Sequence, residues 1–413
     1  MAKKPTVLSL FAGAGGMDYG FKEAGYDIIW ANEYEEIFAE TYRKNIGDHI
    51  VVGDIKEIKN KDIPKGADIV IGGFPCQGFS IANNNRKSVG MEDERNHLYK
   101  EMLRVIKHVK PKFFIAENVK GILNILGGHV MEEIIMPDFR QIGYEVDYKL
   151  LNAADYGVPQ QRERVFIIGS RIGVDKSKFY PKQTHADLHK ISNGQIRQES
   201  KKLHLKDHVT AKEKIGHLDD LWISLNPQKH KGKTVYNHMA YTNVADQFWA
   251  RKHPVDQEDI CDYLKEWRAV VGISTKRVDE IFGYAHTAGH WFRKDNNSGS
   301  IPKPDDWRKL KEILGFDDRY DKQVTELKLR RIVFEQSLRI TNWDRPSDTI
   351  TATSPEIHVN RKRRLSAREC AILQTFPDDF IFAGSLNAMI KQIGNAVPVL
   401  LAKMIANNIK KNL

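Results

Sequence analysis

The strongest constraint on the fold is the alternation of strand-like and helix-like segments over the first 170 residues. Apolar, β-branched runs predict strands at residues 6–11, 27–32, 50–55, 68–73, 112–117, 146–151 and 165–169. Amphipathic stretches of helical length lie between some of them, at residues 35–44, 97–107 and 130–141. Because strands that alternate with helices form sheets covered on both faces, we expect an α/β fold with a doubly wound, mostly parallel sheet.

Glycine and polar residues gather where the predicted strands end. The turn FAGAGG, residues 11–16, follows the first strand, and Glu33, Asp54, Cys76 and Glu117 lie at or just after the ends of the next four. Ligands of such sheets bind beyond the carboxyl ends of the strands. The sequence therefore predicts a ligand site at this edge of the sheet.

The glycine-rich turn favours a nucleoside-bearing ligand that lacks a polyphosphate. Glycine lets the backbone approach a ligand closely and adopt positive φ, and an acid at the end of the second strand, here Glu33, can bind ribose hydroxyls. The spacing differs from the dinucleotide pattern G-x-G-x-x-G, and the sequence contains no G-x-x-x-x-G-K-[ST] phosphate loop. Glycine turns also serve packing alone, and that alternative stays open.

Cys76 lies in the loop GGFPCQGFS, residues 72–80. At the ligand edge of a sheet its thiolate could be exposed and reactive, whereas most buried cysteines are inert small hydrophobes. Cys370, in the apolar stretch ECAILQTF, fits that second description. The three cysteines form no C-x-x-C pattern, so we expect no metal site, no disulfide scaffold and a reducing, cytoplasmic compartment.

A carboxylate and two arginines complete the candidate chemistry. Glu117 ends the very apolar segment FFIA, where burial would raise its pKa; a structural ion pair is the alternative. Arg162 and Arg164 open the seventh strand and, with a period of two, share one face. They could point into the ligand site or form a surface pair.

The positive charge is concentrated in the middle of the chain. Residues 171–345 hold 33 lysines and arginines against 25 acidic residues, and ten of the 15 histidines. The remaining residues hold 31 basic residues against 29 acidic ones. A near-neutral body with a basic insert suits a DNA- or RNA-binding protein, although a lysine-rich protein without such a partner has the same composition.

Eight short motifs occur along the chain, and their identity and order together are informative. They are FAGAGG (11–16), NE (32–33), GDI (53–55), GGFPCQGFS (72–80), AENVKG (116–121), QQRERVFIIG (160–169), RRLSARE (363–369) and QIGNAVP (392–398). In this set and order the sequence resembles the C5-cytosine DNA methyltransferase family of the bacterial restriction–modification type. The resemblance covers residues 7–170 and about 345–402. It leaves out the basic insert, which in this family varies with the DNA sequence recognised.

The resemblance implies S-adenosyl-L-methionine as cofactor, double-stranded DNA as substrate and transfer of a methyl group to C5 of a flipped cytosine. The residues that it places around the cofactor are Phe11, Ala12, Gly13, Gly15, Gly16, Glu33, Tyr34, Asp54, Ile55, Pro75, Leu98, Asn395 and Val397. Glu33 would bind the ribose, and Asp54 would accept a hydrogen bond from the adenine amino group. Tyr34 would lie against the adenine, at a position where the family often has tryptophan.

The same resemblance assigns the catalytic roles. Cys76 would be the nucleophile, Glu117 would face the pyrimidine edge, and Arg164 would donate to the cytosine O2 with Arg162 in support. Two rival hypotheses are an RNA-methylating relative and an inactive DNA-binding protein. The first usually carries Cys-Phe-Thr, which this sequence lacks, and the second has no reason to keep Cys76, Glu117 and Arg164 together.

We expect a catalytic domain formed by residues 1–175 and 386–413, closed by a C-terminal helix from about Leu386, and a smaller recognition domain, 176–385. Predicted DNA contacts are Ser80, Arg95, Arg339, Arg361 and Arg363. Arg339, within residues 337–353, could bind guanine in bidentate fashion; alternatively it supports a strand, and the histidine-rich part recognises the bases. The basic run 361–364 could equally be a solvated surface.

We further expect a monomer that acts beside a cognate restriction endonuclease. The sequence shows no uninterrupted apolar stretch of the roughly 18 residues that a membrane-spanning helix needs.

Overall fold

The computed structural model describes residues 3–75, 97–188, 204–242, 257–283, 304–322, 339–360 and 362–413. The chain divides into two compact units. The first comprises Met1–Ala240, Asn342–Pro355 and Ser366–Leu413, and the second comprises Tyr241–Thr341 and Glu356–Leu365. The boundaries expected from the sequence, at residues 175 and 386, stay predictions; the first compact unit extends well beyond them.

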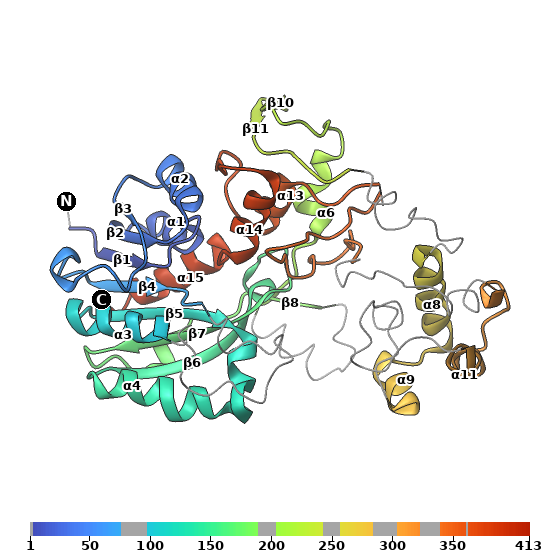
Figure 1. Ribbon diagram of the computed structural model, residues 1–413, viewed down its shortest axis with the longest axis horizontal. Helices are drawn as coiled ribbons and strands as arrows, with labels where there is room; N and C mark the ends of the chain where they lie inside the picture. The colour runs from blue at the N-terminus through green and yellow to red at the C-terminus, as the bar shows by residue number, and fades with distance from the viewer. Residues whose placement is uncertain are drawn as a thin grey trace. The chain divides into compact units, whose positions relative to one another are not determined.

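A seven-stranded sheet forms the centre of the first unit (Figure 1). Its strands are β1 (Thr6–Leu10), β2 (Asp27–Glu33), β3 (Ile50–Val52), β4 (Ile69–Gly72), β5 (Phe113–Val119), β6 (Glu145–Asn152) and β7 (Glu163–Ser170), in the order β3-β2-β1-β4-β5-β7-β6. β7 runs antiparallel to both β5 and β6, and the other pairs are parallel. The expected mostly parallel α/β sheet is confirmed. Because β7 is reversed, its first residues lie at the edge where β5 ends.

Side chains that alternate along the strands build a core on each face of the sheet. Val7 packs on one face with α1 (Gly16–Glu23) and α15 (Val399–Lys410), whereas Leu8 packs on the other with α3 (His97–Val109) and α4 (Met136–Gln141). Figure 1 shows these helix pairs on opposite faces. α2 (Glu36–Asn45) packs on the strands β2 and β3 through Ala39 and Tyr42.

Two helix predictions differ from the structure in detail. The segment predicted as one helix over 130–141 begins with a π-helical turn, Val130–Ile135, before α4, whose second residue is a proline; Pro137 has no N–H for a regular helical bond. The expected C-terminal helix is also two helices, α14 (Leu386–Asn395) and α15, separated by extended backbone at Ala396 and by Pro398.

Taken together, Leu386–Lys410 is apolar and long enough by composition to cross a membrane. However, 61% of its most apolar window is buried within the protein. The sheet-facing residues of α15, such as Leu401 and Ile405, are part of the core. The apolar character of this segment is therefore accounted for by packing.

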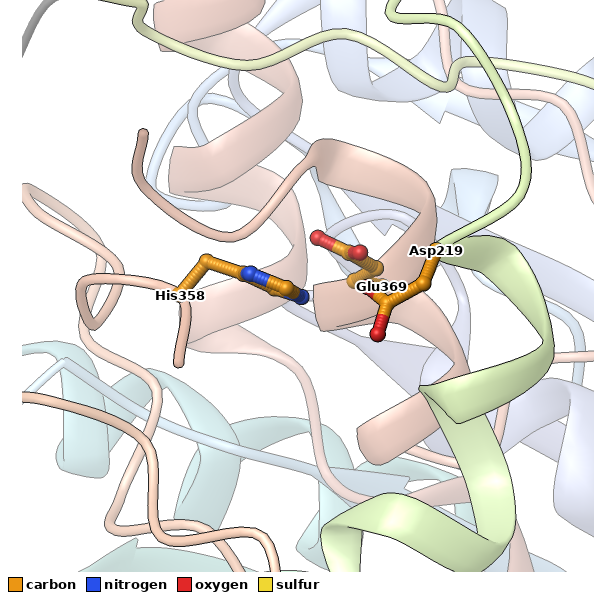
Figure 2. A group of neighbouring side chains, drawn as sticks. All are labelled: Asp219, His358 and Glu369. Atoms are coloured by element: carbon orange, nitrogen blue, oxygen red, sulfur yellow. The ribbon is translucent and has the colours of Figure 1, made fainter. Parts of the chain in front are cut away.

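Shorter elements complete the first unit. They are β8 (His185–Ala186), β9 (Lys206–Asp207), α6 (Ala211–Ile215), β10 (Gln228–His230), β11 (Lys233–Val235) and α13 (Ala367–Leu373). α13 begins with a capping box, in which Ser366 Oγ accepts from the Glu369 N–H at 3.0 Å and Glu369 Oε2 accepts from the Ser366 N–H at 2.7 Å. Figure 2 shows Glu369 on this helix. The buried Cys370 next to it serves packing, as its sequence context indicates.

The second unit contains a small core of its own. Its helices α8 (Gln257–Val271), α9 (Thr275–Phe282) and α11 (Pro304–Leu314) meet around buried Tyr263, Leu264, Val278, Trp307, Leu310, Leu314 and Phe316. Gly272 at φ +70° and the N-cap Ser274 form the turn between α8 and α9. Single bridges join Ile357 to Ile340 and to Arg364.

Candidate active site

The glycine-rich turn between β1 and α1 contains both packing glycines and an open one. A Cβ atom at Gly16 would lie 2.6 Å from the carbonyl oxygen of Val397, and one at Gly15 would strike Ile46 and Tyr42. A Cβ atom at Gly13 would meet nothing within 4 Å. Gly13, at φ +58°, therefore leaves free space beside the strand edge, and Phe11 holds a positive φ of 53° just before it. Positive φ at a bulky residue such as Phe11 costs free energy and is concentrated at functional sites.

Glu33 holds this turn in place. Its Oε2 accepts from the Gly13 N–H at 2.7 Å, and its Oε1 accepts from the Glu35 N–H at 2.9 Å. Burial raises the pKa of Glu33, and these backbone hydrogen bonds oppose the shift. Each carboxylate oxygen has a second lone pair, so the group can accept further hydrogen bonds from a ligand.

The residues at the ends of β2 and β3 include both buried and solvent-exposed side chains. The Asn32 side-chain amide donates to the carbonyl oxygens of Val51 at 3.1 Å and Gly53 at 3.0 Å, which fixes the end of β3 beside β2. Asp54 Oδ1 accepts from the Lys56 N–H at 3.0 Å. Tyr34 is 70% exposed, whereas Ile55 is buried.

The C-terminal motif reaches the same turn. Val397 is buried and its carbonyl lies against Gly16, while Asn395, at the end of α14, is exposed. Pro75 is exposed after β4, and Leu98 is half-buried on α3. The structure thus brings the glycine turn, Glu33 and the segment of Val397 to one edge.

Glu117 and Arg164 form a buried ion pair at that edge. Arg164 Nε lies 3.0 Å from Glu117 Oε1, and the two side chains are 14% and 11% exposed. Burial raises the pKa of Glu117 and lowers the pKa of Arg164, and the pairing of the two charges opposes both shifts. The ion-pair alternative considered for Glu117 is therefore realised, with the pair placed where a ligand site is expected.

The segment that leads to Cys76 is held next to this pair. A Cβ atom at Gly73 would lie 2.9 Å from Glu117 Oε2, so a larger residue here would push on the Glu117 carboxylate. The Asn118 amide donates to the Phe74 carbonyl at 3.0 Å. Cys76 itself, with Ser80, Arg95 and Arg361, lies outside the described residues.

A cavity of about 430 Å³ opens beside Arg164. Its lining is Val119, Lys120, Gly121, Asn152, Gln161, Glu163, Arg164 and Thr349. Lys120 Nζ pairs with Glu163 Oε2 at 2.8 Å on its wall. A volume in this range suits a small ligand group. Thr349 had no distinguishing sequence signal, because it reaches the cavity through tertiary packing.

Arg162 does not share the position of Arg164. It is 1% exposed and donates from Nη1 to the Ile350 carbonyl at 3.0 Å and from Nη2 to the Gly394 carbonyl at 2.7 Å. The predicted pair on one face is therefore divided between two tasks: Arg164 pairs with Glu117, and Arg162 ties two backbone segments together.

Two of the predicted DNA contacts lie within the described residues. Arg339 is half-buried, and its carbonyl accepts from the Ile357 N–H at 2.7 Å. Arg363 is 9% exposed and donates to the Arg364 carbonyl at 3.1 Å. Their contacts with DNA stay predictions.

Known proteins resemble the chain over almost its whole length. The family model described as C-5 cytosine-specific DNA methylase matches residues 5–411. The type II methyltransferase M.FnuDI of Fusobacterium nucleatum is 35% identical over 411 residues, covering 98% of this chain and 94% of the relative. M.NgoFVII of Neisseria gonorrhoeae, also a type II methyltransferase, is 34% identical over 414 residues, covering 98% and 87%. A prophage-encoded E. coli protein, assigned as a DNA modification methyltransferase, has the same fold with a TM-score of 0.57, 21% identity and 99% of both chains covered.

Proposed function

The chain belongs to the family of C-5 cytosine-specific DNA methylases, and from this we propose that it is the modification enzyme of a type II restriction–modification system. Such an enzyme methylates C5 of one cytosine within a specific duplex sequence. The observation that best supports this assignment is the buried Glu117–Arg164 pair beside the segment leading to Cys76. That pair lies at the same sheet edge as Glu33 and the glycine turn.

The residues at this edge fit S-adenosyl-L-methionine, which supplies a methyl group activated on a sulfonium. Gly13 leaves open space, and the buried Glu33 carboxylate can accept hydrogen bonds from ribose hydroxyls. Asp54 would accept from the adenine amino group and the exposed Tyr34 ring would stack on the base. The other predicted contacts are Phe11, Ala12, Gly15, Gly16, Ile55, Pro75, Leu98, Asn395 and Val397. Gly15 and Gly16 contribute mainly by packing the turn.

Cys76 would activate the target cytosine by covalent addition. The base first leaves the duplex, at a cost of roughly a few kcal/mol. The Cys76 thiolate then forms a bond to C6, and the displaced electron pair makes C5 nucleophilic. C5 accepts the methyl group, a base removes the C5 proton, and the C5–H electron pair restores the ring as the sulfur–C6 bond breaks. The thiolate is regenerated.

Glu117 and Arg164 would stabilise the ring during this addition. Glu117 would contact N3 and the amino group at C4, and burial, which raises the pKa of Glu117, favours sharing a proton with N3. Arg164 would donate to O2, where negative charge develops. Arg162 would act indirectly, since both of its bonded nitrogens reach backbone carbonyls.

The second unit and the basic insert would choose the target sequence. We assign base recognition to residues between about 179 and 359 of the recognition domain 176–385, with Arg339 as one candidate, and phosphate contacts to Ser80, Arg95, Arg361 and Arg363. The enzyme would act as a monomer in the cytoplasm beside a cognate restriction endonuclease.

One experiment tests both the activity and the target. The protein is incubated with S-adenosylmethionine carrying a tritiated methyl group and, in parallel, with plasmid DNA or with transfer RNA, and the DNA is then sequenced after bisulfite treatment. We expect label in DNA and protected cytosines at one short recurring sequence. Label in transfer RNA but not in duplex DNA would instead assign the protein to the RNA-methylating relatives.

A further inference from the structure

Two segments of the first unit, distant in sequence, are bound to the same short stretch before β7. One is residues 393–397, which include the predicted cofactor residues Asn395 and Val397. The other is residues 347–351, which include Thr349 on the cavity wall. Gln160 and Arg162 bind both segments directly or through Gln374. We name Gln160, Arg162 and Gln374 the amide–guanidinium clamp.

Arg162 forms the first link of the clamp. Its two terminal nitrogens donate to Ile350 and Gly394, one from each segment, at 3.0 and 2.7 Å. Within the described part of the chain its buried Nε has no hydrogen-bond partner. A buried guanidinium costs much free energy unless its contacts compensate. The two carbonyls that it joins are therefore held firmly relative to each other.

The two glutamines form the second link. Gln160 Oε1 accepts from the Ile350 N–H at 3.1 Å, and Gln160 Nε2 donates to Gln374 Oε1. Gln374 Nε2 then donates to the carbonyls of Ile393 at 3.1 Å and Ala396 at 2.6 Å. Both glutamines are fully buried. The N–H and C=O of Ile350 are thus both bound by groups that also hold residues 393–396.

Direct packing strengthens the connection. A Cβ atom at Gly394 would collide with the backbone of Thr351 and Ala352, so the two segments touch without any side chain between them. Thr349 Oγ1 donates to the Gln161 carbonyl at 2.6 Å, which carries the constraint to the cavity wall. Residues 393–397 and the cavity wall beside Arg164 are therefore held by one connected set of contacts.

We propose that the amide–guanidinium clamp couples cofactor binding to the capture of the target cytosine, with Gln374 as a positioning residue. This inference rests on the proposed function, since it takes the cavity beside Arg164 as part of the cytosine site. Coupling of this kind is reciprocal: the duplex raises the affinity for the cofactor by the same factor by which the cofactor raises the affinity for the duplex.

The test measures the dissociation constant of S-adenosylhomocysteine by calorimetry, with and without a saturating target duplex. The wild type should bind it about tenfold more tightly with the duplex, within the usual range of such coupling. In Gln374→Met, which keeps the volume but removes the amide, the ratio should approach one. Binding of either ligand alone should change by less than about threefold, because both polar atoms of the Gln374 side chain are bound to protein groups.

Gln392→Met is the matched control. Gln392 is a buried glutamine on α14 that donates to the Ala383 carbonyl at 2.9 Å and takes no part in the clamp. Gln392→Met should lose about as much unfolding free energy as Gln374→Met and keep the coupling ratio of the wild type. Gln160→Met gives a second variant if Gln374→Met does not fold, and the double variant should lose no more coupling than either single change.

The outcomes separate this inference from the proposed function. If the wild type binds neither ligand and transfers no methyl group, the proposed function is wrong. If it binds and transfers normally but Gln374→Met and Gln160→Met keep the full ratio, the clamp is a structural feature only. Loss of coupling in Gln392→Met as well would also contradict the inference.

Discussion

The Glu33 carboxylate binds backbone N–H groups of the protein, and the same carboxylate is expected to bind the ligand. Its position after the second strand was predictable from the sequence. Its bonds to the N–H groups of Gly13 and Glu35 were not, because they depend on how the turn after β1 packs beside β2. The same holds for Arg162: its period-two spacing with Arg164 was visible, but its carbonyl partners come from residues about 190 and 230 positions away.

Replacing Glu33 tests the ribose contact. Glu33→Ala should raise the dissociation constant for S-adenosylmethionine about tenfold or more, since a hydrogen bond to a charged group contributes roughly 1.5–3 kcal/mol. Calorimetry measures the change. Glu36→Ala removes an exposed carboxylate on the same strand–helix connection and should leave the affinity unchanged. Equal affinities for wild type and Glu33→Ala would place the ribose elsewhere.

Asp18 predicts a pH dependence of stability. It is buried in the first turn of α1, where it accepts from the Tyr42 hydroxyl at 2.9 Å, and burial raises its pKa from 3.8 to about 6. The folded protein therefore binds the proton more tightly than the unfolded chain. This contribution to stability is fully present below pH 3.8, declines as pH rises towards about 6, and is absent above it.

Asp18→Asn should remove this dependence. Relative to the wild type, the variant should gain stability between about pH 4 and 6 and keep a gain of at most about 3 kcal/mol above it. Chemical denaturation of both proteins at a series of pH values gives the difference directly. A difference that does not vary with pH would show that Asp18 is not buried in the protonated form.

At the scale of elements, the strands were predictable and their ends less so. Period-two and β-branched patterns located all seven strands of the large sheet, and the polar residues expected at the strand ends do lie at one edge of it. The division of the last helix at Pro398 and the π-helical turn before Pro137 follow from proline's missing N–H. Both prolines are visible in the sequence, but the local response to each depends on packing.

The turn between β1 and α1 gives a prediction that separates strain from ligand binding. Gly13→Ala and Gly232→Ala each introduce a Cβ atom into open space at positive φ, +58° and +81°. Each should cost about 1–2 kcal/mol of unfolding free energy. Only Gly13→Ala should weaken the binding of S-adenosylhomocysteine, because Gly232 lies in the β10–β11 turn, away from the glycine-rich turn. Equal affinities in the two variants would remove Gly13 from the cofactor site.

At the scale of the whole molecule, the uneven charge of the sequence suggested a catalytic part and a DNA-recognition part. The boundaries of the two compact units, in contrast, depend on tertiary contacts. The segment 337–353, expected to recognise bases, is divided between the units after Thr341. Its second part carries Thr349 and Ile350, whose backbone is tied to Gln160 and Arg162. Nothing local in the run of threonines and prolines shows this, because the partners come from the stretch just before β7 and from the end of α14.

A segment exchange tests where target choice lies. Residues 241–341 are replaced by the corresponding part of a type II relative, and residues 342–355 are kept so that the clamp survives. The chimaera should methylate the sites of the donor while keeping the covalent chemistry of Cys76. Bisulfite sequencing of treated plasmid checks this. A folded, active chimaera that still methylates the original sites would place target choice outside residues 241–341.

The central claim is that Cys76 attacks a cytosine in duplex DNA, and covalent trapping tests it most directly. The protein is incubated with S-adenosylmethionine and a target duplex that carries 5-fluorocytosine, whose C5 substituent cannot leave as a proton. Intact-mass analysis and denaturing electrophoresis should show a one-to-one protein–DNA adduct for the wild type. Cys76→Ala should bind the same duplex and form none. An adduct in Cys76→Ala, or none in a wild type that methylates the unmodified duplex, would contradict the account.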